Sequence, residues 1–97
     1  MRPEHPLEEL LNHYTHIKVF KTLATSTKPL TAYMLAKEAG LVRAKVARII
    51  QVFESHGWVV KTPYRPASYT LNMDKQEVKK LVELMAEMGY LSYDKQK

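Results

Sequence analysis

The side chains that could do chemistry in this sequence are mainly cations, and they concentrate in its middle. Residues 28 to 69 hold seven lysines and arginines against two glutamates, and this net charge of +5 equals that of the whole chain. Three of the four arginines lie here, namely Arg43, Arg48 and Arg65. The planar guanidinium fork of arginine suits phosphate oxygens and guanine edges better than a lysine ammonium does. The sequence therefore indicates an anionic partner, with nucleic acid as the leading candidate.

Groups that could support catalysis or hold a metal are few. The absence of cysteine excludes thiolate nucleophiles, disulfides, cysteine-ligated zinc and iron–sulfur clusters. Glu9, His13 and His16 have a spacing that could hold zinc on one helix, but no further ligand follows at a recognisable spacing, which favours ordinary surface histidines. There is no glycine-rich phosphate loop and no serine-centred nucleophile motif. We therefore expect neither an enzyme nor a metal or cofactor site.

The central arginines require a helix to position them, and the apolar pattern around them predicts one over residues 43–56, ended by Gly57. The predicted inward stripe is Val46, Ile49, Ile50 and Phe53. The opposite face then presents Arg43, Ala44, Ala47, Arg48 and Gln51, with Lys45 at its rim. Arginine can bond guanine and glutamine can bond adenine, each through two hydrogen bonds, whereas alanine permits close approach or contacts a thymine methyl. This pattern predicts a DNA-reading face; the alternative is a merely solvated one.

A shorter helix is expected before this one. Thr31 can accept a backbone hydrogen bond as its N-cap, Leu35, Ala36 and Ala39 form its inward stripe, and Gly40 ends it. Thr31 and Tyr33, at its start, could bond a phosphate beside the free N–H groups of the helix N-terminus. For Thr31, simple capping is the alternative.

A β-hairpin is predicted after the central helix. Residues 58–62 and 68–72 are rich in β-branched and aromatic side chains, and the two prolines of residues 63–67 favour a turn between the strands. Lys61, Tyr64 and Arg65 would project two cations and a phenol, which are side-chain types that position a protein on sugar-phosphate. The alternative is a stiff surface turn without a ligand.

Two further helices are expected at the ends of the chain. The first, over residues 7–25, has the apolar series Leu7, Leu10, Leu11, Tyr14, Ile17, Phe20 and Leu23, after which Leu30 is a short extended residue. The last, over residues 75–88, is predicted to be capped by Asp74 and to turn Val78, Leu81, Val82, Met85 and Met88 inward.

The last helix and the tail carry more apolar side chains than so small a core requires. The surplus consists of Leu84, Met88, Tyr90, Leu91 and Tyr93. Contiguous apolar surface of this kind often marks a contact with another protein. We therefore predict a two-fold homodimer through this region, helped by the first helix; the alternative is that these residues cover the chain's own core.

The run from Thr31 to Val59, with its helix, Gly40 turn, second helix and Gly57, resembles the winged helix-turn-helix domain of prokaryotic (bacterial or archaeal) transcription regulators. Lys61 to Tyr69 resembles the wing of such domains. The resemblance covers residues 7–72. It implies an α+β fold, mostly helical, with a three-helix core, a two-stranded wing and a C-terminal helix. It also implies that the third helix lies in the major groove and that the wing touches the backbone or the minor groove.

At 97 residues and 11.3 kDa, with a composition close to the globular average, the sequence predicts one domain over residues 1–97. Its winged-helix core spans residues 7–72, and residues 73–97 form a C-terminal helix and tail. We expect a small, basic, cytoplasmic homodimer that regulates transcription by binding double-stranded DNA at a palindromic site, with no membrane segment and no evident small-molecule substrate. The alternative is a winged-helix module that binds proteins in a transcription or replication complex.

Overall fold

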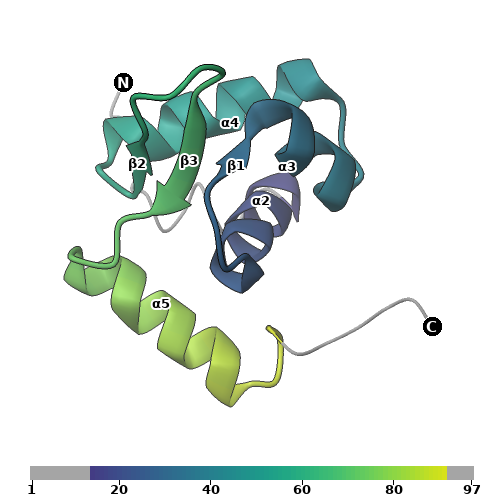
Figure 1. The fold of residues 1–97 in the computed structure, drawn as a ribbon. Helices are drawn as coiled ribbons and strands as arrows, with labels where there is room; N and C mark the ends of the chain where they lie inside the picture. The colour runs from purple at the N-terminus through teal and green to yellow at the C-terminus, as the bar shows by residue number, and fades with distance from the viewer. Residues whose placement is uncertain (1–13, 92–97) are drawn as a thin grey trace, which may run out of the picture.

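The computed structural model describes residues 14–91, which form four helices and three short strands (Figure 1). In chain order the elements are α2 (Tyr14–Thr25), β1 (Leu30–Thr31), α3 (Ala32–Ala39), α4 (Arg43–Ser55), β2 (Val59–Lys61), β3 (Ser68–Leu71) and α5 (Gln76–Glu87). The predicted α+β architecture, mostly helical with a hairpin after the third helix, is confirmed. The part of the first predicted helix before Tyr14 lies outside the described residues.

The sheet has the strand order β1-β3-β2, and both pairings are antiparallel. The β2–β3 hairpin is the predicted one, with each strand shorter than predicted. The residue predicted to be extended, Leu30, pairs with Tyr69 and thereby adds a third strand beside the hairpin. This pairing ties the start of α3 to the first residues of β3, next to the tip of the hairpin.

A single core joins the helices to the sheet, and all the predicted inward residues of α3 and α4 are buried in it. Phe20 of α2 and Phe53 of α4 are no more than 1% exposed and meet edge to face, with ring centroids 6.2 Å apart. Trp58 completes this aromatic group. Because α4 packs its whole apolar stripe here, its opposite face is left to solvent.

Both ends of α3 are formed as the sequence predicted. The Thr31 hydroxyl accepts a hydrogen bond from the Met34 N–H at 3.1 Å, and this satisfies one of the free donors of the first turn. Gly40 ends the helix in the left-handed conformation, at φ 72°. The sharp turn that follows directs the chain into α4 after only two residues.

Tyr14 belongs to the apolar series that predicted the first helix, but its side chain is 67% exposed. The apolar series from Tyr14 to Leu23 advances in steps of three residues, and each step rotates about 60° short of a full turn. Over three such steps the direction changes by roughly 180°, so Tyr14 and Leu23 lie on opposite sides of α2. The side chain that fills the inward face is Val19, which is fully buried.

The prediction that Asp74 caps the last helix is also wrong. The N-cap of α5 is Lys75, and it makes no side-chain capping bond. Asp74 lies one residue before the N-cap, in a turn formed by Asn72. The Asp74 N–H donates to the Asn72 side-chain oxygen at 3.2 Å, and the Lys75 N–H donates to the Asn72 carbonyl. Asn72 therefore forms the turn that an aspartate cap was expected to form.

The inward face of α5 is narrower than predicted. Val78 is fully buried and Leu81, Val82 and Met85 are half-buried, but Met88 is 72% exposed. Met88 lies ten residues after Val78, which places it about 80° away around the helix and beyond the part of the body that α5 covers. The inward assignment of Met88 is therefore wrong.

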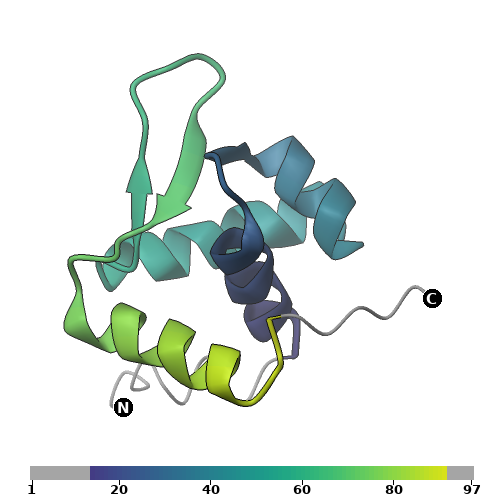
Figure 2. The same cartoon turned by 60° about the horizontal axis from the view of Figure 1, so that its bottom comes forward.

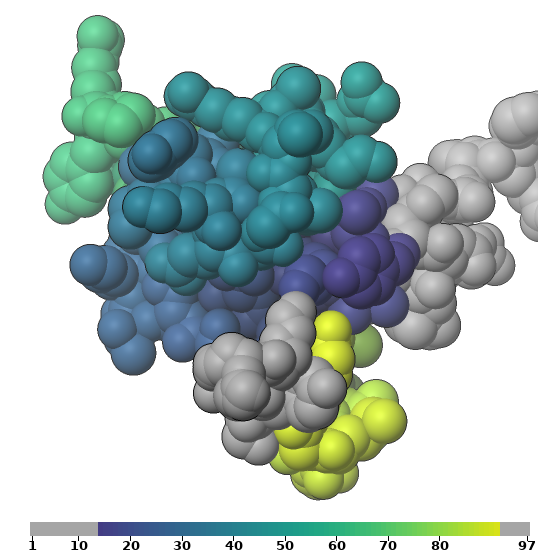
Figure 3. All heavy atoms as spheres, turned by 90° about the vertical axis from the view of Figure 1, so that its right-hand side faces the viewer, coloured from purple at the N-terminus to yellow at the C-terminus, as the bar shows by residue number. Residues whose placement is uncertain are grey.

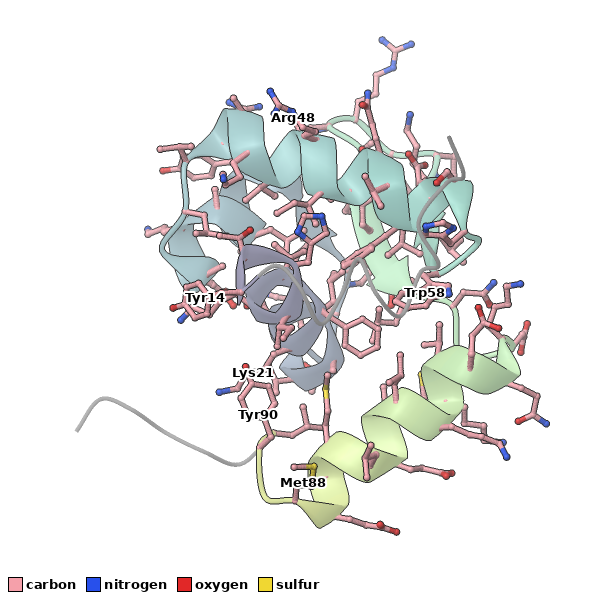
Figure 4. All side chains as sticks on the ribbon, turned by 180° about the vertical axis from the view of Figure 1, so that it is seen from behind. Tyr14, Lys21, Arg48, Trp58, Met88 and Tyr90 are labelled. Atoms are coloured by element: carbon pink, nitrogen blue, oxygen red, sulfur yellow. The ribbon has the colours of Figure 1, made fainter. Side chains whose placement is uncertain are left out.

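The exposed sides of α4 and α5 face opposite ends of the described part of the molecule. In Figures 1 and 4, α4 lies along one end and α5 along the opposite end, with α2 and the sheet between them. None of the helices formed by residues 14–91 is both long and apolar enough to span a membrane.

Candidate nucleic-acid interface

The outward side of α4 carries the residues predicted to face a duplex, and all of them are exposed. We call this surface the α4 face; its residues are Arg43, Ala44, Lys45, Ala47, Arg48 and Gln51. Figure 4 shows Arg48 on the side of α4 turned away from α5 and from the core. The α4 face is thus the exposed side of a helix whose opposite stripe is buried in the core.

Helical geometry orders these residues across the α4 face. Ala44, Arg48 and Gln51 lie within about 60° of one another, directly opposite the buried stripe. Arg43 and Lys45 each lie about 100° from Ala44, on opposite flanks. The centre therefore combines two side chains that can bond base edges with one that takes little space, and each flank carries a cation.

The charges of α4 run against its dipole. The first turn contains Arg43 and Lys45 and no acid, while Glu54 stands near the carboxyl end. A helix N-terminus already carries a partial positive charge, and a cation there is unfavourable by about 0.3 to 1 kcal/mol. The N-cap, Val42, supplies no side-chain acceptor for the free N–H groups. An anion bound here would satisfy the free N–H groups and offset both cations.

The start of α3 contributes Tyr33, whose side chain is exposed, and Thr31, whose hydroxyl oxygen already accepts a hydrogen bond. Tyr33 is 57% exposed in the first turn, so its hydroxyl is open to a ligand. The Thr31 oxygen caps the helix, as described above, which is the alternative the sequence left open for this residue. Its O–H hydrogen is not used by that bond and remains a donor.

The hairpin presents the remaining predicted contacts at its tip, residues 63–67. Below the tip, the Thr62 N–H donates to the Ser68 carbonyl at 2.9 Å, and the two hydroxyls lie 2.9 Å apart. This closure holds Tyr64, which is 70% exposed, and the exposed Arg65 beyond the body of the protein. Lys61 is exposed at the end of β2. Figure 2 shows the hairpin extending away from the helices, on the side remote from α5.

The fold brings most of these residues to one end of the molecule. In the space-filling view of Figure 3, the side chains of α3 and α4 form the upper surface, the hairpin tip stands out at its edge, and α5 occupies the other end. The seven cations of residues 28–69 lie on α3, α4, the hairpin and the loop before β1.

The alternative chemistry of the sequence gains no support from the geometry. Among residues 14–91 there is no group of three histidines or acids close enough to hold a metal ion. His16 packs its ring edge against Phe53, with centroids 6.0 Å apart. Glu9 and His13, the other residues of the conceivable zinc site, lie outside the described residues.

Two structural features were missed from the sequence, one beside the α4 face and one at α5. Val42, the N-cap of α4, is 69% exposed and borders the α4 face. In the sequence, only its position two residues after Gly40 indicated that it precedes the helix. The second is a hydrogen bond from the Trp58 indole N–H to Glu77, 2.7 Å long. It joins residues 19 positions apart, and no periodicity marks such a contact.

Comparison with known proteins agrees with this architecture. Residues 13–72 match the family model described as "Sugar-specific transcriptional regulator TrmB", a range that includes α2 through β3. Among solved structures, the chain resembles the crystal structure of a transcriptional regulator from Thermotoga maritima, with a TM-score of 0.61 and 14% sequence identity. That match covers 93% of this chain and 69% of the other. None of the curated proteins matches the chain.

Proposed function

The chain belongs to the TrmB family of transcriptional regulators, and from this premise we propose that it binds duplex DNA as a homodimer. In this proposal α4 lies in the major groove and the hairpin tip contacts the sugar-phosphate backbone or the minor groove. The observation that carries the proposal is the α4 face, where the centre offers base-bonding side chains and both flanks offer cations. That combination is what a helix in a major groove requires.

The roles within α4 follow from position. Arg48, at the centre, would bond guanine O6 and N7 as a fork, and Gln51 would bond adenine. Ala44 and Ala47 would let the helix approach the bases closely or touch a thymine methyl. Lys45, on one flank, would meet a phosphate, and Arg43, beside the helix N-terminus on the other, would reach a phosphate or the edge of a neighbouring base.

The contacts outside α4 would position the protein without reading sequence. Lys61, Tyr64 and Arg65 on the hairpin, together with Tyr33 and the Thr31 hydroxyl on α3, can donate to phosphate oxygens. All except Thr31 are exposed, and they lie on elements that share the core with α4. A duplex held at these points beside α4 would be fixed in register.

The proposed dimer contact is made by α5 and the residues after it. Leu84 is 51% exposed and Met88 is 72% exposed. Both continue from the half-buried Leu81 at helical spacing, which widens the apolar side of α5 beyond what the body covers. Leu91 is half-buried nearby, and Tyr93 lies outside the described residues.

Tyr90 takes a different part in this contact. Its ring is half-buried beneath the Lys21 ammonium of α2, at 4.6 Å from the ring centroid. In the dimer Tyr90 would therefore offer an edge of its ring and not its whole surface. Because α5 lies at the end opposite α4, pairing through α5 leaves the α4 face free for DNA. Two α4 helices about 34 to 36 Å apart would match a palindromic site.

The test of the proposal is binding to random duplex at several salt concentrations, followed by selection of the preferred site from a random pool. Each neutralised phosphate lowers the slope of log affinity against log salt by about 0.9. We expect a slope of roughly −4 for each subunit, or about −8 for the dimer, from the cations Arg43, Lys45, Arg48, Lys61 and Arg65 of each chain. A flat response with no selected site would contradict the proposal and favour a protein-binding module.

A further inference from the structure

The attachment of α5 to the rest of the molecule depends on a small number of contacts. Only Val78 of this helix is fully buried. Two directional contacts lie near its ends: the Trp58 indole N–H donates to Glu77 Oε2 at 2.7 Å, and the Lys21 ammonium stands 4.6 Å from the Tyr90 ring centroid. The direction of α5 is thus set by a thin apolar seam and two polar contacts.

Trp58 connects the first of these contacts to the centre of the molecule. Its side chain is 2% exposed, and its ring centroid lies 5.7 Å from that of Phe53 in α4 and 5.8 Å from that of Phe20 in α2. The indole is therefore fixed with respect to α4. A bond from this indole to α5 relates the directions of the two helices.

The chain just before α5 forms a pivot at the same place. The Asn72 N–H donates to the Trp58 carbonyl at 2.8 Å, and the Asn72 side-chain amide donates to the Gly57 carbonyl at 3.0 Å. Lys75 packs so closely over Gly57 that a Cβ there would lie 3.1 Å from the Lys75 Cε. These contacts fix where α5 begins, but they leave its direction open. Glu77, one residue into the helix, is the nearest side chain that constrains it.

We propose that the Glu77–Trp58 hydrogen bond sets the direction of α5 relative to α4, and that it thereby determines which separation of two DNA half-sites the dimer accepts. The second clause rests on the proposed function, because it takes α5 as the dimer contact and α4 as the reading helix. Glu77 is in this sense a positioning residue. It would touch neither the DNA nor the partner subunit.

The chemistry of the bond makes it suitable for this role. The acceptor is a carboxylate and the donor belongs to a buried ring, so removal of the acceptor leaves the indole N–H without its partner. Glutamine at position 77 would keep an acceptor oxygen, whereas alanine would remove it. The pair Glu77→Ala and Glu77→Gln therefore separates the bond from the charge. Glu83→Ala, on the exposed side of α5, is the matched control.

The direction of α5 can be measured without DNA. The chain has no cysteine, so Ser55→Cys on α4 and Ala86→Cys on α5, both at exposed positions, provide two unique sites for spin labels. Pulsed electron–electron double resonance then gives the distribution of distances between the label on α4 and the label on α5. Labelled chain is diluted in unlabelled chain so that only labels within one chain are measured. We expect narrow distributions for the unmodified sequence, Glu77→Gln and Glu83→Ala, and a broad or shifted one for Glu77→Ala. Trp58→Phe, which removes the donor and keeps a ring, should behave like Glu77→Ala.

The consequence for DNA is measured on duplexes whose two half-sites are moved together or apart by up to about half a turn. For Glu77→Ala, the preference between the best and worst separations should fall by about tenfold, the effect expected from loss of one hydrogen bond to a charged group. Affinity for a single half-site and the mass in sedimentation should be unchanged. Glu77→Gln should restore the preference.

The outcomes separate this inference from the proposed function. A distribution for Glu77→Ala that is as narrow as the original and centred at the same distance overturns the inference, whatever the protein binds. A broad distribution with an unchanged preference for separation also overturns it. If the unmodified protein binds no half-site or remains monomeric, the proposed function fails, while the distance distribution still decides whether Glu77 directs α5.

Discussion

Arg48 is the side chain on which base selection should depend most. It lies at the centre of the α4 face, opposite the buried stripe, and α4 is held by four core residues. We expect Arg48→Ala to weaken binding to the preferred duplex by about 1 to 3 kcal/mol and to reduce discrimination at one base pair. Fluorescence anisotropy on the selected site and its single-base variants measures both effects. An equal loss on every sequence would contradict a base-reading role for Arg48.

Arg65 provides the contrasting case at the hairpin tip. Its exposed position beyond the Thr62–Ser68 closure suits a phosphate contact, which carries no sequence information. Arg65→Ala should therefore lower affinity by the same factor on preferred and random duplexes, and make the salt slope less steep by about 0.9 for each subunit, or about 1.8 for the dimer. A loss confined to the preferred duplex would instead assign Arg65 to base recognition in the minor groove.

The role of Thr31 can be determined by measuring the effect of its replacement on the free energy of unfolding and on DNA affinity separately. Because its hydroxyl caps α3, Thr31→Ala should lower the free energy of unfolding by about 1 kcal/mol, as measured by urea denaturation. Thr31→Ser keeps the oxygen and serves as the control. If the hydroxyl also donates to a phosphate, Thr31→Ala will weaken DNA binding under conditions where the protein is fully folded. Unchanged affinity there would leave capping as its sole role.

At the scale of elements, the prediction that matters most concerns α5. Leu84 is half-exposed in the widened apolar side of this helix, so Leu84→Glu should place a charge inside the proposed contact between subunits. In sedimentation the mass should fall from that of a dimer toward the 11.3 kDa of one chain. Glu83→Lys, an exposed charge change one residue earlier, should leave the mass unchanged. A dimer that survives Leu84→Glu would remove α5 from the interface.

The elements best predicted from the sequence are α3 and α4. Each buries one complete face in the chain's own core, so the spacing of apolar residues reports the burial directly, and Gly40 marks the turn between them. The exposure of the α4 face followed from the same spacing. Which bases or phosphates these residues contact does not follow from periodicity and stays a prediction.

The elements predicted less well depend on contacts far apart in the sequence. β1 is two residues long and exists because Leu30 pairs with Tyr69, a partner that no local pattern identifies. The start of α5 is set by Asn72 bonding back to residues 57 and 58, which overrode the capping preference of Asp74. Tyr14 belongs to the apolar series of the first helix but is exposed, because a series of three-residue steps drifts around a helix. In each case tertiary contacts decided what local preference could not.

For the whole molecule, the uneven distribution of charge yields a test with a built-in control. Arg43 and Lys45 belong to the α4 face, whereas Lys79 and Lys80 are exposed on α5, at the other end. Replacing Arg43 and Lys45 together with glutamine should make the slope of log affinity against log salt less steep by about 1.8 for each subunit, or about 3.6 for the dimer. The same change at Lys79 and Lys80 alters net charge equally and should leave the slope nearly unchanged. Equal effects would mean that net charge alone attracts the duplex.

Because the cations of the first turn of α4 oppose its dipole, ionic strength should change two quantities in opposite directions: the stability of the unbound protein and its affinity for a polyanion. Added salt screens the repulsion at the amino end of α4 and should stabilise the unliganded fold, while it weakens any hold on a polyanion. High salt should therefore both raise the free energy of unfolding of the unbound protein and shift the binding equilibrium toward the unbound protein. We therefore expect Arg43→Glu to raise the free energy of unfolding of the free protein and to weaken its binding to the proposed duplex.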